Sequence, residues 1–300
     1  MRATKALSAG RRYLEIQRLA KQTGRPTDEL IQLYALECFL DRLLQSRFDE
    51  NFVLKGGVLL AALDARRPTR DIDLAARTLS NSVSEILAVI REIASVTLDD
   101  GLQFHPDRAT AQVIREGSDY SGVRVTLIGT LSRAAIHLHV DVNVGDPIWP
   151  PAQKVLLPRL LSGALTVRGY AIEMVLAEKI VTAVARGTTN TRWRDFVDIY
   201  TLIRRHNIDA TTFRRSLLGV AQHREVTVVP LQSVFVGFAA RAQPRWLAWL
   251  IKQRLESIVP SEFSSVLEFV AAFSDPIVEN QPAIGTWECA RQCWVATAVV

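Results

Sequence analysis

Residues 51–77 read NFVLKGGVLLAALDARRPTRDIDLAAR and carry the most informative pattern of the chain. A short apolar run leads into a Lys-Gly-Gly turn at 55–57, and beyond an apolar segment and a basic loop, acidic and apolar residues alternate at 71–74. Side chains at i and i+2 of a β-strand point the same way, so Asp71 and Asp73 leave one face of a sheet while their apolar neighbours enter the core. The stretch therefore predicts a strand that presents two carboxylates side by side.

Two adjacent carboxylates repel each other and are costly to remove from water. A divalent cation is a good reason to place them together, because Mg²⁺ prefers one or two carboxylates plus substrate phosphates. The glycines of the turn at 55–57 suit a close approach of the backbone to a phosphate at a helix start. Asp141 is a third candidate, since it lies on the polar face of a strand predicted at 135–145. Three such carboxylates are the arrangement that two-metal phosphoryl and nucleotidyl transfer requires.

The 300-residue chain can form one large domain or two smaller ones. Its net charge of +5 and its pI near 9.3 are mildly basic, which favours an anionic partner. The three cysteines form no disulfide framework, so a reducing cytosol is expected. The sequence has no apolar run of a signal peptide at its start, and no window approaches the roughly 18 apolar residues of a membrane span. We therefore expect a cytoplasmic protein with no membrane partner.

Hydrophobic spacing predicts an α+β fold with a small mixed sheet and a helical C-terminal half. Helical spacing at 12–21 and 27–44 predicts an N-terminal buttress, with Thr27 as an N-cap. Short β-rich runs follow from 109 to 145, and prolines at 147–151 mark a boundary. The expected parts are residues 1–48, 49–150 and 151–300.

The helical half carries its own charged candidates. The apolar stripe of the helix around Met174–Val184 leaves Lys179 on a wetter face, and a helix predicted at 193–205 turns Asp198 outward. Asp195 lies in the first turn of that second helix, where a charge that favours the helix dipole contributes about 0.3–1 kcal/mol. Taken without further information, these residues fit a salt-bridged helix start.

Five short blocks in this order resemble the signature of the AbiEii/AbiGii-type nucleotidyltransferase toxins, a branch of the polymerase-β-like nucleotidyltransferase superfamily that includes the mycobacterial Men-type toxins. The blocks are Lys55-Gly56-Gly57, Asp71-Ile72-Asp73-Leu74, residues 141–146, Glu178-Lys179 and residues 194–198. The similarity spans roughly residues 30 to 277. It implies a polymerase-β-like core with a small mixed sheet at 49–150, completed by a mainly helical domain.

The resemblance implies a nucleotidyltransferase that uses an NTP and Mg²⁺, with Mn²⁺ as an alternative ion. Its catalytic residues would be Asp71, Asp73, Asp141, Lys179 and Asp195, and the first three would hold the metal. Its cofactor-binding residues, beside the nucleotide phosphates, would be Lys55, Gly56, Gly57, Thr69 and Arg70. The sequence departs from the pattern at Val58, where a Ser or Thr commonly follows the glycines and would help to bind phosphate.

The resemblance also implies the toxin of a type IV toxin–antitoxin (abortive infection) system, which transfers an NMP to the 3′ end of tRNA and blocks translation. An AbiEi-like antitoxin encoded nearby would be its partner. Two alternatives stay open. One is a nucleotidyltransferase that acts on a hydroxyl of a protein or of a small molecule such as an antibiotic. The other is a non-catalytic, basic RNA-binding module.

Two further groups of residues have a structural and a functional interpretation. The loop arginines Arg66, Arg67 and Arg70 fit a solubilising loop and a phosphate-facing patch equally well. His137 and His139 alternate on the strand of Asp141, but nothing else in the sequence completes a zinc-like set, so we expect them to be structural.

Overall fold

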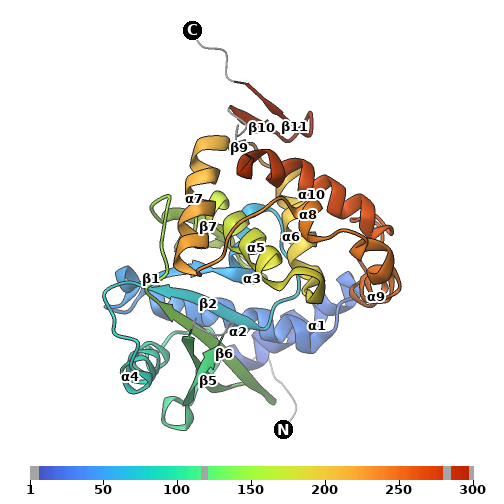
Figure 1. Ribbon diagram of the computed structural model, residues 1–300. Helices are drawn as coiled ribbons and strands as arrows, with labels where there is room; N and C mark the ends of the chain where they lie inside the picture. The colour runs from blue at the N-terminus through green and yellow to red at the C-terminus, as the bar shows by residue number, and fades with distance from the viewer. Residues whose placement is uncertain (1–6, 116–120, 280–284, 297–300) are drawn as a thin grey trace. The chain divides into compact units, whose positions relative to one another are not determined.

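The computed structural model describes residues 7–115, 121–279 and 285–296 (Figure 1). The chain divides into two compact units, of which the first combines Met1–Asp146 with Ala152–Tyr170 and the second combines Pro147–Pro151 with Ala171–Val300. The first unit contains the N-terminal helices as well as the strands of the main sheet. The three-part division at 1–48, 49–150 and 151–300 stays a prediction.

Two N-terminal helices open the first unit, α1 (Ser8–Thr23) and α2 (Thr27–Leu44). Pro26, and not Thr27, stands at the N-cap of α2, so the predicted cap is wrong by one residue. The ring of proline already fixes φ near the value that a helix entry needs, so no hydroxyl cap is required to start the helix. α2 is buried around most of its circumference, including the charged Glu37 and Arg42. It is therefore a central element of the unit.

A mixed sheet fills the first unit, in the strand order β3-β5-β6-β2-β1-β8-β7, with β4 also paired to β5. Its strands are β1 (Phe52–Lys55), β2 (Asp71–Ala76), β3 (Leu102–Phe104), β4 (Thr110–Arg115), β5 (Ser121–Leu131), β6 (Ala134–Val144), β7 (Gln153–Pro158) and β8 (Ala164–Gly169). The central strand β2 runs antiparallel to β1 and parallel to β6 (Figure 1). The stretch that carries the acidic pair is thus the middle of the sheet.

Two helices lie between strands in this unit. The short helix α3 (Gly56–Leu59) follows β1 directly, and one 3₁₀ turn (Leu60–Leu63) continues it. α4 (Val83–Ala94) begins after Ser82, whose hydroxyl accepts a hydrogen bond from the backbone N–H of Glu85. Residues 82–85 read Ser-Val-Ser-Glu, a capping-box sequence, and the helix starts where such a sequence indicates.

The second unit is mainly helical. Its helices are α5 (Ile172–Arg186), α6 (Trp193–Ile203), α7 (Ala210–His223), α8 (Leu231–Val234), α9 (Phe238–Gln253) and α10 (Phe263–Val278), and a small sheet has the order β11-β10-β9. The bounds of its strands are Ile208–Asp209 for β9, Thr286–Glu288 for β10 and Cys293–Val295 for β11. The predicted α+β class, a mixed sheet followed by a helical half, is confirmed. None of the described helices is long and apolar enough to cross a membrane.

Aromatic rings form the core of the second unit. The ring of Phe263 lies 5.1–5.3 Å from the ring centres of Trp193, Phe196 and Trp246. The C-terminal hairpin adds Trp287, whose indole N–H donates to the carbonyl of Ile203 at 2.7 Å. Because its polar atom is satisfied there, this large side chain can be buried fully and ties the hairpin to the helices.

Residues 147–151, between the two halves of the sequence, belong to the second unit, where Trp149 contacts α7. The Arg215 guanidinium of α7 lies 3.5 Å from the centre of the Trp149 ring, a cation–π contact. Ser216 donates to the carbonyl of Trp149 at 2.8 Å. These contacts explain why residues 147–151 belong with the helices, although the sequence indicates a simple boundary there.

Candidate active site

Three carboxylates lie on one face of the main sheet. Asp71 and Asp73 leave the same side of β2, while Ile72 is fully buried on the other side. β6 pairs Asp141 with Asp73 and His139 with Asp71. Register partners present their side chains on the same face, so Asp141 joins the two carboxylates of β2. The structure therefore brings together the three acidic residues singled out in the sequence.

Two of these carboxylates, Asp73 and Asp141, belong to a row of side chains that crosses five strands. From β4 to β1 the row runs through the register partners Gln112, Arg124, Asp141, Asp73 and Lys55. Two carboxylates lie at its centre, with a cation on the neighbouring strand to either side. Opposite charges beside each carboxylate offset part of the repulsion between them.

Arg124 is the member of this row that the sequence analysis missed. Its Nε donates to Oδ1 of Asp141 and its Nη2 to Oδ2, each at 2.7 Å. The hydrogen bond with Asp141 raises the pKa of Arg124 in spite of partial burial, and the charges of Asp141, Asp71 and Asp73 add to the increase. The sequence does indicate this residue through the alternation Val123-Arg124-Val125, because alternation places the arginine on the polar face of its strand.

Lys55 forms a buried ion pair at the other end of the row. Its Nζ lies 2.6 Å from Oδ2 of Asp146, and the two side chains are only 7% and 3% exposed. The hydroxyl of Tyr170 donates to the same oxygen at 3.4 Å, and its ring centre lies 5.8 Å from Nζ. These contacts hold the end of β1 against the segment that follows β6. Contact of Lys55 with a nucleotide phosphate stays a prediction.

The two glycines of the turn allow the chain to lie directly against the acidic strand. Gly56 has a φ of +66°, and a Cβ atom at this position would be 1.9 Å from Oδ2 of Asp73. A Cβ at Gly57 would be 2.6 Å from Oγ1 of Thr69. Thr69 thus supports the turn, while the neighbouring Arg70 side chain is exposed. These close contacts explain why residues 56 and 57 are both glycines. The approach of the turn, Thr69 and Arg70 to a nucleotide phosphate stays a prediction.

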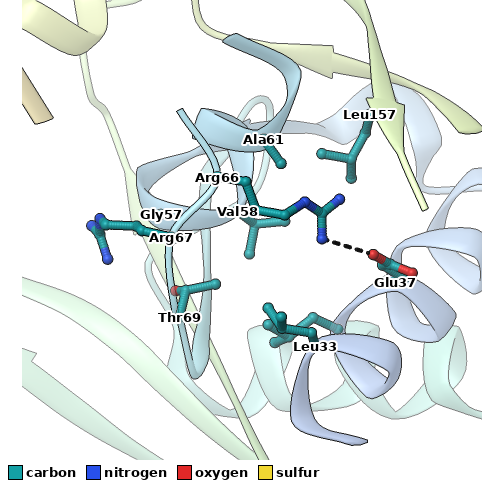
Figure 2. Close-up of a pocket in the computed structure, with 10 residues that line it drawn as sticks. Leu33, Glu37, Gly57, Val58, Ala61, Arg66, Arg67, Thr69 and Leu157 are labelled. Carbon is teal, nitrogen blue, oxygen red and sulfur yellow. Dashed lines mark hydrogen bonds and ion pairs between the residues drawn. The ribbon is translucent and has the colours of Figure 1, made fainter. Parts of the chain in front are cut away.

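Val58 lies on the buried side of the turn. With Leu33, Leu36 and Leu157 it lines a cavity of about 10 Å³, shown in Figure 2. This volume has room for at most about one water molecule. The valine side chain is buried beside these leucines, and the rest of the cavity has a polar lining of Glu37, Arg66, Arg67 and Thr69.

Two arginines of the loop, Arg66 and Arg70, have different surroundings. Arg66 reaches across the cavity of Val58 to Glu37, with Nη1 3.2 Å from Oε1 (Figure 2). Both oxygens of Glu37 also accept the backbone N–H of Leu160, each at 2.9 Å. Burial raises the pKa of Glu37, although these donors lower it in part. Arg66 therefore has a structural partner, and Arg70 remains the exposed cation beside the acidic strand.

The donor chemistry of this face suits Mg²⁺. Asp71 and Asp73 supply hard oxygen ligands, and Mg²⁺ commonly takes one or two carboxylates with substrate phosphates and water completing the shell. Among residues 7–115, 121–279 and 285–296, however, no three His, Cys, Asp or Glu side chains are arranged to hold a metal ion. Asp141 has both oxygens engaged by Arg124. The residues present thus fit an ion held by Asp71, Asp73 and phosphate oxygens.

The second unit has a buried charge cluster of its own. Lys179 of α5 donates to Oδ1 of Asp195 at 3.0 Å and to Oδ2 of Asp198 at 2.7 Å, both on α6. Arg192 donates to the other oxygen of Asp195 at 2.7 Å. Asp198 is 3% exposed, so the prediction that it turns outward is wrong. The ammonium group of Lys179 offers a partner inside the unit, which helical periodicity does not show.

Asp195 is ionised in this cluster. Burial by itself would raise the pKa of Asp195, but the charges of Lys179 and Arg192 outweigh burial and lower the pKa to about 2. A carboxylate with two cationic partners keeps its charge in a buried position. The two predicted residues of the helical half, Lys179 and Asp195, are therefore joined to each other directly.

A family model described as nucleotidyl transferase AbiEii toxin, type IV TA system, matches residues 38–271. This match covers most of the chain, and the chain belongs to the AbiEii family of nucleotidyltransferase toxins. It is therefore a nucleotidyltransferase, and membership of a type IV toxin–antitoxin family implies an NTP substrate and an antitoxin partner.

Two solved structures from Helicobacter pylori are similar to this chain. One, described as a candidate nucleotidyltransferase, is 15% identical with a TM-score of 0.48, over 83% of this chain and 96% of that chain. The other, JHP933, is 15% identical with a TM-score of 0.46, over 82% and 91% of the two chains. No curated protein sequence matches this chain.

Proposed function

We propose that this toxin transfers an NMP from an NTP to the 3′ end of tRNA in a Mg²⁺-dependent reaction and so blocks translation. The observation that carries the proposal is the placement of Asp71, Asp73 and Asp141 on one face of a sheet, in a chain of this family. An AbiEi-like antitoxin encoded nearby is the proposed partner.

In this reaction the oxygen of the acceptor hydroxyl forms a bond to the α-phosphorus of the NTP. The bond between that phosphorus and the α,β-bridging oxygen breaks, and pyrophosphate leaves with the electron pair. The hydroxyl proton goes to a base of the site, a role that we assign to Asp141. Binding the two reactants together lowers the entropic part of the barrier.

Asp71 and Asp73 would hold the Mg²⁺ ion, with Asp141 as the third carboxylate. When bound, the ion supplies positive charge that offsets the negative charge of the triphosphate at the reacting centre. The remaining residues would bind the nucleotide phosphates and orient them; they are Lys55, Gly56, Gly57, Thr69, Arg70 and Lys179. We assign Asp195 the task of orienting Lys179, because its carboxylate accepts a hydrogen bond from that ammonium group at 3.0 Å.

Charge supports a nucleic acid as the acceptor. The chain has a net charge of +5, and Arg70 is exposed next to the first residue of the acidic strand. Exposed cations near a catalytic site attract the phosphate backbone of an RNA and release its counterions on binding. A neutral small molecule gains nothing from this charge.

The proposal is tested by incubating the purified protein with α-³²P-labelled NTPs, Mg²⁺ and total tRNA. We expect labelled tRNA, and we expect periodate oxidation of the terminal ribose to prevent labelling if the 3′ end is the acceptor. Asp71→Asn and Asp73→Asn remove a charge without changing shape, and each should lower the rate at least about 100-fold. The matched control is Asp107→Asn, an exposed acidic residue of the same unit.

The same assay separates the alternatives when tRNA is replaced by protein lysate or by an aminoglycoside. Label that enters a protein or an antibiotic, but not tRNA, contradicts the proposed acceptor. Transfer that survives both substitutions in β2 contradicts the assignment of the site. A protein that labels none of the acceptors, and whose melting temperature does not rise with Mg²⁺ and NTP, would favour the non-catalytic module.

A further inference from the structure

Arg124 is paired with Asp141, the carboxylate that the proposed reaction needs as a base. Both oxygens of Asp141 accept hydrogen bonds from its guanidinium, at 2.7 Å each. This fork-to-fork geometry is the strongest pairing that an arginine and a carboxylate make. The arginine side chain is 31% exposed and the aspartate side chain only 10%, so the arginine is the more accessible partner of the pair.

The pairing also reduces the repulsion among the carboxylates of the site when no metal ion is bound. Asp71, Asp73 and Asp141 crowd three negative charges onto adjacent strands, and such groups destabilise each other when all are ionised. Arg124 is the register partner of Asp141 on β5, on the side away from β2. Its charge acts on Asp71 and Asp73 as well, as the raised pKa of Arg124 reflects.

A divalent cation at Asp141 would conflict with this pairing. Metal ligation uses the oxygen lone pairs of the carboxylate and brings two positive charges next to the guanidinium, which repels them. Asp141 therefore serves either as the partner of Arg124 or as a ligand and base of the reaction.

We propose that Arg124 is a positioning residue that competes with a divalent cation for Asp141, holding the carboxylate when no cation is bound and releasing it when one binds. The inference rests on the proposed function, because it concerns the third carboxylate of the same site. It assigns to β5, outside the sequence blocks of the family, control over the affinity of the site for metal.

The experiment measures the binding of Mn²⁺ alone, without nucleotide, by electron paramagnetic resonance. We expect Arg124→Gln to bind Mn²⁺ at least about tenfold more tightly than wild type, because the competitor is removed. Adding Asp141→Asn to that variant should abolish the gain, since the competition acts through this carboxylate. Arg168→Gln, which removes an arginine paired with Glu50 at 2.9 Å elsewhere in the same unit, should leave Mn²⁺ affinity unchanged.

Circular dichroism and melting in EDTA establish that each variant is folded. If Arg124→Gln does not fold, Arg124→Lys carries the test, because lysine keeps a charge but cannot form the two-pronged contact. Its Mn²⁺ affinity should rise by about threefold over wild type. Equal or weaker Mn²⁺ binding in the folded variants overturns the inference, and so does the absence of Mn²⁺ binding in wild type and variants alike.

Failure of this inference and failure of the proposed function give different results. If tRNA is labelled by wild type while Mn²⁺ affinity is insensitive to residue 124, the proposed function stands and the competition is rejected. If Mn²⁺ affinity increases in Arg124→Gln while no acceptor is labelled, the competition stands and the proposed reaction is rejected.

Discussion

The carboxylate of Asp73 lies so close to the backbone of Gly56 that a Cβ atom at residue 56 would be 1.9 Å from its Oδ2 oxygen. The contact joins the end of β1 to the middle of β2, where Lys55 and Asp73 are register partners. Any side chain larger than hydrogen at residue 56 must therefore displace the Asp73 side chain, or else shift the acidic strand or the turn. The geometry of the proposed metal and triphosphate site depends on this single close approach.

Gly56→Ala should lower kcat/KM for NTP at least about 100-fold, because a displacement of about 1 Å at a reacting centre has effects of that size. Gly24→Ala is a matched control: Gly24 has a φ of +67°, against +66° for Gly56, but nothing lies within 4 Å of its Cβ position. Its backbone strain should cost about 1 kcal/mol of stability and leave the rate unchanged. Transfer rates and urea unfolding measure the two effects. Equal rates in the two variants would contradict the role of the contact.

Val58→Thr tests whether the missing hydroxyl limits nucleotide binding. Because the Val58 side chain is buried beside Leu33 and Leu157, a hydroxyl there is also buried and should lower the free energy of unfolding by about 1–3 kcal/mol. The KM for NTP should stay within about twofold of wild type. Ala61→Ser places a hydroxyl on the same cavity as a control for burial alone. A clear fall in KM for Val58→Thr only would show that residue 58 faces the nucleotide.

Lys179→Met should destabilise the protein by about 3–5 kcal/mol, since it leaves the buried carboxylates of Asp195 and Asp198 without their shared ammonium group. Lys252→Met removes an exposed lysine of α9 in the same unit and should change stability little. Urea unfolding measures both. Adding Asp198→Asn to Lys179→Met should restore part of the loss. If Lys179→Met is as stable as wild type but loses nucleotidyl transfer activity, the lysine acts on the substrate and does not stabilise the fold.

Asp195 should make stability depend on pH in the acidic range. Its pKa is about 2 in the folded protein, below the ordinary value of 3.8, so its stabilising effect is complete above pH 4 and is lost as the pH falls toward 2. The shift is equivalent to about 2 kcal/mol at neutral pH. The stability margin of wild type over Asp195→Asn should therefore shrink by about 1 kcal/mol between pH 5 and pH 3.

Urea unfolding at pH 7, 5 and 3 measures this margin for Asp195→Asn. The control is Glu256→Gln, an exposed acidic residue of the same unit. A margin that is the same at all three pH values would show that Lys179 and Arg192 do not hold the charge of Asp195.

Local patterns account for much of the fold. Alternation at 71–74 and 135–145 predicts β2 and β6 and the faces that they bury, because the side-chain period of a strand is two. Ser82 and Gly24 mark helix ends through local hydrogen bonding and left-handed backbone geometry. Thr27 fails as a cap since the preceding proline already sets the backbone at the helix entry. Each of these features depends on residues a few positions apart.

Partner choice among charged residues could not be predicted in the same way. Nothing local distinguishes Arg124, which forms the fork with Asp141, from Arg70, which stays exposed. Asp198 reads as an outward residue of its helix, yet it is buried because α5 brings Lys179 against it. An ion pair forms only between residues on strands or helices that become neighbours. The sequence spacing of the two residues does not predict which elements these are.

From the sequence we could predict that Asp71 and Asp73 share one face of a strand, that glycines precede them, and that the blocks of a nucleotidyltransferase toxin follow in order. Periodicity and chain order are properties of the covalent chain and survive without any tertiary contact. The folded structure was needed to show that Asp141 lies beside Asp73, that Arg124 holds it, and that Lys55 pairs with Asp146. Those relationships depend on strand register and burial, which arise when distant segments pack together and exclude water.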